Sequence, residues 1–223
     1  MTLALFPAAS GMPEHLDDGA VLLRGWATDA AAQWIAAAQQ LAAQAPWRSM
    51  QVPGGQRMSV ATTNAGQWGW VSDLQGYRYS AVDPHSGQPW PALPGWLKAQ
   101  ARAAAAAAGY AGFAPDACLL NRYRPGAKMG LHRDQDEADM AAPIVSVSLG
   151  LPCTFLWGGL ARQQRPRRLE LAHGDVLVWG GPSRLVYHGV APLGDGLHPL
   201  LGSERWNLTL RMARRRYLGA QPD

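Results

Sequence analysis

The C-terminal half of this chain alternates short apolar runs with turn residues, and this pattern limits its possible folds more than any other feature. Runs rich in Val, Leu, Ile and Thr are separated by Gly, Pro and Asp. Seven such runs follow Pro115: ACLLNRYR, PIVSVSLG, CTFLWG, RRLELA, DVLVWG, RLVYHGV and RWNLTLRMA. Short strands at regular spacing with turn signals between them predict a compact β-sandwich or barrel.

Two helices are predicted in the N-terminal half. Residues 29–45 are rich in Ala and Gln, with Thr28 as the expected N-cap and Pro46 ending the run. Residues 96–108 end in an alanine tract, and Gly109 is the expected C-terminal cap. We expect both helices to lie against the β core. The chain is therefore predicted to be a single α+β domain, mainly β, over residues 1–223.

Residues 46–95 join the two helices and contain many Gly and Pro residues and six aromatic side chains. One short strand, MSVATT, is expected there. Such a stretch is either a set of irregular loops or a lid over a binding site, and composition alone slightly favours loops. No internal repeat or interdomain linker is evident.

Composition excludes several classes of protein. Apolar residues make up 48% of the chain and charged residues 16%, which excludes a disordered chain. No apolar run approaches the ~18 residues of a membrane span. The two cysteines cannot form a disulfide framework, and the first residues lack the basic start of a signal peptide, so we expect a cytoplasmic protein. The net charge of +4 is a weak indication of an anionic partner.

Three side chains in the β region have the composition of a metal site. His132 and Asp134 form an H-x-D pair, and residues two apart in extended chain point to one side. His188 follows in a later predicted strand. Two histidines and one carboxylate form the facial triad of non-haem Fe(II) oxygenases, which leaves coordination positions open. Since H-x-D also occurs by chance and a strand histidine is usually packed, these three residues alone favour packing over a metal.

The last predicted strand strengthens the metal interpretation. In RWNLTLR, four polar residues alternate with apolar ones and share one face: Arg205, Asn207, Thr209 and Arg211. Buried arginines need anionic partners, and a dicarboxylate cosubstrate such as 2-oxoglutarate supplies two carboxylates. The alternative is an exposed edge strand with its arginines in water. Asn121 and Tyr123 share a face of another predicted strand, and both can hydrogen-bond a carboxylate.

These segments resemble one known family. NRYRPGAKMGLHRDQDE, PIVSVSLG, HGDVLVWGG, YHGV and RWNLTLR, with PGGQRMSVATTN and QGYRYS upstream, are similar to the AlkB family of Fe(II)/2-oxoglutarate-dependent dioxygenases. The resemblance covers nearly the whole chain. It implies a double-stranded β-helix (jelly roll) as the catalytic core over residues 116–213, flanked by N-terminal helices, with residues 46–95 as a nucleotide-recognition lid.

The resemblance also implies roles for individual residues. Fe(II) would be bound by His132, Asp134 and His188, with O2 as the second cosubstrate. The distal carboxylate of 2-oxoglutarate would be held by Arg205 and Tyr123, and the carboxylate near the metal by Arg211 and Asn121, with Asn207 supporting the same pocket.

For the substrate, the resemblance implies a flipped base between Trp70 and His132. Tyr77 would contact a flanking phosphate, Asp136 the exocyclic amine of the base, and Met58 and Arg162 the pocket wall. Surface or core packing is the alternative for each of these residues. Val52, before PGG, lacks the polar group that would offer the substrate a hydrogen bond.

The implied reaction is oxidative demethylation of N-alkylated bases, of the 1-methyladenine and 3-methylcytosine type, in single- or double-stranded DNA or in RNA. 2-Oxoglutarate becomes succinate and the methyl group leaves as formaldehyde. We expect a monomer. One competing function is a 2-oxoglutarate oxygenase acting on protein or small molecules, which needs no aromatic lid. Another is a non-catalytic nucleic-acid-binding module, which has no need of the triad and the two arginines.

Overall fold

The computed structural model describes residues 13–215 and residue 217. The expectation about a signal peptide concerns residues that lie largely outside this range. Three antiparallel sheets and two helices make up the described chain. The helices are α1 (Ala31–Gln44) and α2 (Gly95–Ala107).

Two of the sheets face each other. The larger has seven strands in the order β1 (Pro13–Asp17), β2 (Ala20–Leu23), β11 (Val176–Trp179), β8 (Ile144–Gly150), β13 (Arg205–Arg211), β6 (Ala117–Tyr123) and β3 (Ala61–Gly66). The second has four, in the order β10 (Arg167–Leu171), β9 (Cys153–Trp157), β12 (His188–Val190) and β7 (Met129–His132). A separate hairpin pairs β4 (Gly69–Asp73) with β5 (Gly76–Ser80).

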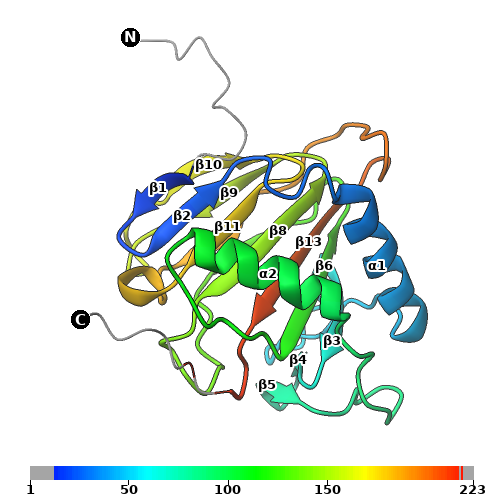
Figure 1. Cartoon of the computed structure of the whole chain (residues 1–223). Helices are drawn as coiled ribbons and strands as arrows, with labels where there is room; N and C mark the ends of the chain where they lie inside the picture. The colour runs from blue at the N-terminus through cyan, green and yellow to red at the C-terminus, as the bar shows by residue number, and fades with distance from the viewer. Residues whose placement is uncertain (1–12, 216, 218–223) are drawn as a thin grey trace.

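The large sheet is buried on both faces. Both helices cover one face, and the four-stranded sheet lies behind the other (Figure 1). Alternate residues of β11 separate accordingly: Val176 and Val178 pack in the cluster under the helices, whereas Leu177 and Trp179 pack between the sheets. Strands buried on both faces are typically rich in apolar residues, as β11 is, whereas β13 alternates polar and apolar side chains. The predicted fold class, a mainly β core flanked by helices, is confirmed.

Both helices lie where they were predicted, within two residues at each end. Pro46 follows the end of α1, and Gly109 follows the C-cap of α2 with a positive φ of 89°. The prediction for Thr28 was wrong. The N-cap of α1 is Ala30, without a side-chain hydrogen bond, because Asp29 and Ala30 form an extra turn before the helix begins.

The seven predicted strands are all present, but one is shorter than expected. In RLVYHGV only His188–Val190 is extended, because Arg184 ends a short 3-10 turn and directs its guanidinium to backbone carbonyls. MSVATT corresponds to β3, displaced toward the C-terminus. The sequence reading missed five strands, which are short or lie among turn residues: β1, β2, β4, β5 and β7.

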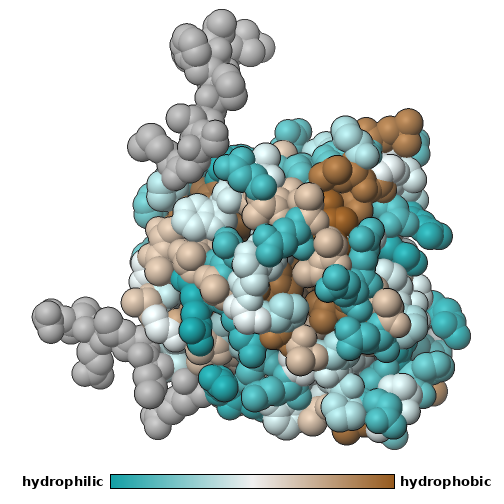
Figure 2. All heavy atoms as spheres, turned by 45° about the vertical axis from the view of Figure 1, so that its right-hand side comes forward, coloured by the Kyte–Doolittle hydropathy of each residue, from teal (hydrophilic) through white to brown (hydrophobic). Residues whose placement is uncertain are grey.

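No helix in the described part of the chain is long and apolar enough to cross a membrane. On the face shown in Figure 2, hydrophobic side chains form separate small patches among hydrophilic ones. The arginine-rich run at 162–168 lies at the turn between the paired strands β9 and β10 and is mostly exposed.

Candidate active site

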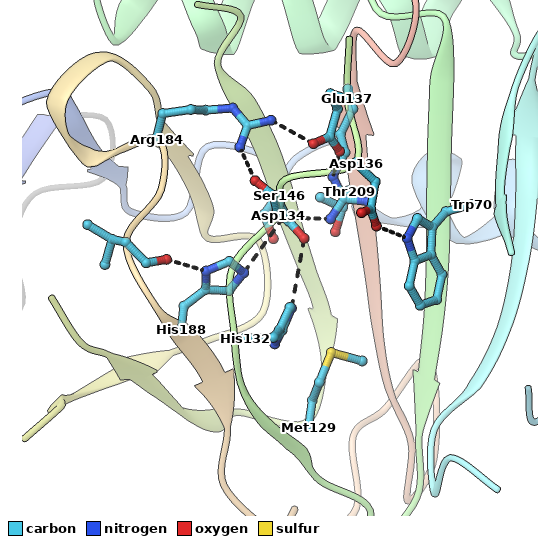
Figure 3. Close-up of polar contacts among 12 residues, drawn as sticks. Trp70, Met129, His132, Asp134, Asp136, Glu137, Ser146, Arg184, His188 and Thr209 are labelled. Carbon is cyan, nitrogen blue, oxygen red and sulfur yellow. Dashed lines mark hydrogen bonds and ion pairs between the residues drawn. The ribbon is translucent and has the colours of Figure 1, made fainter. Parts of the chain in front are cut away.

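The three predicted metal ligands meet at one end of the four-stranded sheet. His132 ends β7, His188 begins β12, and the two residues are paired in register. Asp134 lies two residues beyond β7. Its Oδ1 is 3.9 Å from His132 Nε2, and its Oδ2 is 3.7 Å from His188 Nε2. One possible ligand atom from each residue lies within 4.8 Å of the others, close enough to surround one ion (Figure 3).

The backbone determines which nitrogen of each histidine faces the ion. His132 Nδ1 lies 2.9 Å from the Gly130 carbonyl, and His188 Nδ1 lies 3.0 Å from the Val186 carbonyl. Because a carbonyl only accepts, each Nδ1 carries the proton and each Nε2 presents its lone pair. Burial and the neighbouring His132 lower the pKa of His188 to about 4, so this imidazole is neutral at pH 7. Two imidazole nitrogens and one carboxylate fit Fe(II).

Asp134 is held as a carboxylate by positive charge behind it. Burial is the largest single influence and opposes its ionisation, but the surrounding positive groups, with Arg211 the strongest, together outweigh burial and keep the pKa of Asp134 well below its usual range. Arg211 Nη2 donates to Asp134 Oδ2 at 2.8 Å. Arg211 Nε also lies 3.4 Å from Glu137 Oε1, an ion-pair distance without hydrogen-bond geometry. Glu137 in turn accepts from Arg184 Nη2 at 2.9 Å.

The polar face of β13 is buried. β13 lies between β8 and β6 in the large sheet, so the alternative of an exposed edge strand is wrong. Asn207 donates to Ser146 Oγ at 2.8 Å and accepts from Thr209. Register pairing places Arg205 beside Tyr123 and Asn207 beside Asn121, so the two polar faces predicted separately form one surface.

A buried guanidinium needs an anionic partner, and the described residues provide none for Arg205. Its side chain is part of a residue only 1% exposed, and its Nη2 donates to Ser148 Oγ at 3.1 Å. Its Nε and Nη1 are buried and have no hydrogen-bond partner among the residues that the structure describes. The Tyr123 hydroxyl has only the Met129 sulfur, at 3.9 Å, and burial raises the pKa of Tyr123, so the hydroxyl stays a donor. A buried guanidinium next to a phenol donor fits a carboxylate of a dicarboxylic acid.

All the predicted site residues line one cavity of about 550 Å³. We call its inner part the pocket floor, which comprises His132, Asp134, His188, Asn121, Tyr123, Arg205, Asn207 and Arg211. We call its outer part the pocket mouth, which comprises Met58, Trp70, Tyr77, Asp136 and Arg162. Val52 also lies on the cavity wall. Trp179 contacts His188 edge-on, with ring centroids 5.1 Å apart, and so packs against one member of the His-Asp-His cluster.

The pocket mouth is arranged around Trp70. The Trp70 ring stacks on Tyr77, with centroids 5.5 Å apart and planes 13° apart, and its Nε1 donates to Asp136 Oδ2 at 2.8 Å. Figure 3 shows Trp70 and His132 apart, with no contact drawn between them. Tyr77 is half exposed.

Several residues of the site were missed by the sequence reading. Arg184 and Glu137 are buried beside Asp134, and Ser146 and Ser148 receive the polar face of β13. The two serines had a signal, because they alternate with valines in PIVSVSLG and so share the face toward β13 side chains. No sequence signal indicated Arg184, because its contacts come from segments far away in the sequence.

Comparisons with known proteins agree with this geometry. The family model for the 2OG-Fe(II) oxygenase superfamily matches residues 19–211. The chain is 54% identical to the alpha-ketoglutarate-dependent dioxygenase AlkB of Escherichia coli (strain K12), over 95% of this chain and 98% of that protein. This chain belongs to the AlkB family. It is therefore an Fe(II)- and 2-oxoglutarate-dependent dioxygenase, and its cofactors are Fe(II), 2-oxoglutarate and O2.

More distant members of the AlkB family are also similar. The human protein named nucleic acid dioxygenase ALKBH1 is 38% identical over 49% of this chain and 28% of its own length. The solved structure of OsALKBH1 superposes with a TM-score of 0.78 at 27% identity, covering 90% of this chain and 99% of that chain. The fold of the described residues is thus the fold of the family.

Proposed function

We propose that this dioxygenase removes N-linked methyl groups from bases such as 1-methyladenine and 3-methylcytosine in DNA, and that it can act on RNA. The observation that carries the proposal is one cavity that joins a His-Asp-His cluster, a buried arginine with two unpaired nitrogens and a partly buried tryptophan. An oxygenase that acts on small molecules would need the first two features but would not need a stacking side chain at the pocket mouth. The names of the relatives, AlkB and nucleic acid dioxygenase, support the same substrate class.

In this proposal the pocket floor holds the iron and the cosubstrate. His132, Asp134 and His188 bind Fe(II) through the two Nε2 atoms and the carboxylate. Arg205 and the Tyr123 hydroxyl hold the distal carboxylate of 2-oxoglutarate. This assignment is supported by the two guanidinium nitrogens of Arg205 that have no partner.

The remaining residues of the floor orient the inner end of the cosubstrate. Arg211 and the side-chain amide of Asn121 would hold the carboxylate near the metal. Arg211 already pairs with Asp134, so it would serve the metal ligand and the cosubstrate together. Asn207 is fully engaged by Ser146, Val147 and Thr209, which supports a role in holding the pocket wall.

The pocket mouth would receive the substrate. A flipped base would stack on Trp70 and lie across from His132, while Asp136 would meet its exocyclic amine. One Asp136 oxygen already accepts from Trp70, so the base would use the other. A carboxylate at this position also favours the positive charge of a base methylated at a ring nitrogen. Met58 would line the base pocket, and Tyr77 would face a flanking phosphate.

Positive charge beside the pocket mouth supports a polyanionic partner. The guanidinium groups of Arg133 and Arg162 lie 5.4 and 5.8 Å from the ring centroid of Tyr187, and both arginines are exposed. Tyr187 and the two arginines line the same cavity as Trp70. Phosphates of a nucleic acid next to the flipped base would be within the reach of such side chains.

The chemistry divides between the cofactors and the chain. When bound, the iron, 2-oxoglutarate and O2 together convert the N-methyl group to N-hydroxymethyl, with succinate and CO2 as coproducts. The hydroxymethyl product then breaks its C–N bond, which releases formaldehyde and the unmodified base. The chain's own side chains bind, orient and shield the reacting groups, and residues 46–95 act as the lid over the core at 116–213.

A direct test is to incubate the Fe(II)- and 2-oxoglutarate-loaded protein with a single-stranded oligonucleotide containing one 3-methylcytosine. We expect equal amounts of formaldehyde and unmodified cytosine, with none from an unmethylated oligonucleotide. Succinate formation without demethylation of DNA or RNA oligonucleotides would contradict the proposal and favour an oxygenase for protein or small molecules.

The proposal also includes a monomer that works in the cytoplasm. The two free, buried cysteines are in keeping with the reducing conditions of that compartment.

A further inference from the structure

Two consecutive acidic residues just after the metal ligand Asp134 bind the same hairpin. Asp136 Oδ2 accepts from Trp70 Nε1 at 2.8 Å, and Glu137 Oε1 accepts from the Tyr79 hydroxyl at 2.7 Å. Trp70 on β4 and Tyr79 on β5 are register partners, so their side chains leave the hairpin on one face. The two hydrogen bonds therefore join one face of the hairpin to the segment that carries Asp134.

The hairpin depends on such contacts for its placement. β4 and β5 form a two-stranded sheet of their own, outside the two larger sheets. An isolated two-stranded hairpin is at best marginally stable in water. The Asn64 side chain fixes the backbone of Trp70 through two hydrogen bonds, of 2.9 and 3.0 Å, but it does not touch the ring. The indole stacks on the exposed Tyr77 and packs against a small buried cluster that includes Tyr79, and its one side-chain hydrogen bond goes to Asp136.

Glu137 connects this docking contact to the pocket floor. It is 8% exposed and its second oxygen accepts from Arg184 Nη2 at 2.9 Å. Arg184 also donates to the backbone carbonyls of Asp134 and Ala142, at 2.7 and 2.9 Å. Arg211 lies between the carboxylates of Glu137 and Asp134. The Glu137 carboxylate, which accepts from Tyr79, is thus linked through Arg211 by two ion pairs to the Asp134 carboxylate that is proposed to bind iron.

We propose that Asp136 and Glu137 are positioning residues that dock hairpin β4–β5 onto the metal-ligand segment and so set the place of Trp70 over the pocket. The inference deepens the proposed function, on which its substrate readout rests. A docked hairpin holds the base at a constant distance from the iron site. A loosened hairpin lets 2-oxoglutarate be consumed while the base is misplaced.

The variants must loosen the hairpin without disturbing buried charge. Glu137→Ala would leave Arg184 and Arg211 short of a buried anion and would risk unfolding. Tyr79→Phe removes one hydroxyl and keeps every ion pair. Its matched control is Tyr110→Phe, because the Tyr110 hydroxyl donates one hydrogen bond of 2.8 Å to the Gly19 carbonyl, next to β1 and β2.

The first measurement is amide hydrogen exchange over residues 69–80 in the Fe(II)- and 2-oxoglutarate-loaded protein, kept anaerobic and without nucleic acid. A hydrogen bond to a charged acceptor is worth enough for Tyr79→Phe to raise exchange there about tenfold. Tyr110→Phe should leave these amides unchanged. Exchange in Tyr79→Phe equal to that of the unmodified protein would overturn the docking role.

The second measurement separates the hold on Trp70 from the charge of Asp136. Asp136→Asn keeps an oxygen that can accept from the indole, whereas Asp136→Ala does not. On a 3-methylcytosine oligonucleotide, formaldehyde per succinate should fall about tenfold in Asp136→Ala and about twofold in Asp136→Asn. Equal losses would assign Asp136 to the base charge and overturn its positioning role. If the unmodified protein yields no formaldehyde, the proposed function fails, while the exchange result still decides the docking.

Discussion

The floor and the mouth of the pocket hold their polar side chains in opposite ways. Most floor residues project from paired strands, are buried and are held by neighbouring strands, as Asn207 is by Ser146. Mouth residues lie on a separate hairpin and on connecting segments, and Tyr77 is 50% exposed. The comparison indicates that the floor is preorganised for cofactors common to the family, whereas the mouth determines what is brought to them. Substitutions should therefore stop all turnover at the floor and only uncouple it at the mouth.

The largest effect is expected at the metal site. His132→Ala removes one of three ligands, so formation of both succinate and formaldehyde should fall more than about a hundredfold, beyond the loss typical of mutating a residue behind a ligand. Mass-spectrometric quantification of both products checks this. Iron binding to the anaerobic protein should weaken in parallel. Normal succinate formation in this variant would contradict the assignment of the floor.

Arg205 offers a test with opposite signs for stability and function. In the protein without cosubstrate, Arg205→Met removes a buried guanidinium with two unpaired nitrogens, so the free energy of unfolding should rise by about 1–3 kcal/mol. The same variant should lose 2-oxoglutarate binding.

Urea unfolding with and without 2-oxoglutarate measures both effects of this variant. The unmodified protein should gain stability from 2-oxoglutarate by linkage, and the variant should not. A variant that is still stabilised by 2-oxoglutarate would show that Arg205 does not hold its carboxylate.

At the mouth, Trp70→Ala should separate the two products. Loss of stacking is worth about 1–3 kcal/mol per base, so formaldehyde formation should fall about tenfold or more. Succinate formed without oligonucleotide should change far less, because the floor is untouched. Equal loss of both products would place Trp70 in the cofactor site and remove the distinction between floor and mouth.

The smallest effect is expected for an exposed arginine. Arg162→Ala should weaken oligonucleotide binding a few-fold and lower the steepness of its salt dependence by about one phosphate contact. Fluorescence anisotropy at several salt concentrations measures this. The exposed Arg102 of α2 serves as control. A salt profile identical to that of the unmodified protein would exclude a phosphate contact at this position.

The pocket floor was predictable from the sequence to a greater extent than the mouth. The alternation of Arg205, Asn207, Thr209 and Arg211 already predicted one polar face, since strand periodicity is local. Whether that face was buried was not predictable from RWNLTLR itself, because an edge strand has the same pattern. Only the central position of β13 decides it.

Strand β7 shows why the rest escaped prediction. Its four residues, MGLH, carry too little pattern to be distinguished from a loop, yet β7 brings His132 next to His188 through register pairing. The prediction that Thr28 caps α1 failed for a related reason. A favourable N-cap residue does not determine where a helix begins when a turn lies between them. Short elements take their structure from their neighbours.

The sequence by itself determined the kind of fold, the candidate ligands of the proposed metal site and the polar face of its last strand. Each of these follows from residue chemistry and from a spacing of two along an extended chain. Only the tertiary structure decided that Arg184 and Glu137 stand behind Asp134 and that Asp136 and Glu137 receive Trp70 and Tyr79. Those contacts join residues 47 to 66 positions apart, and no local pattern specifies them because they depend on how the connecting segments pack.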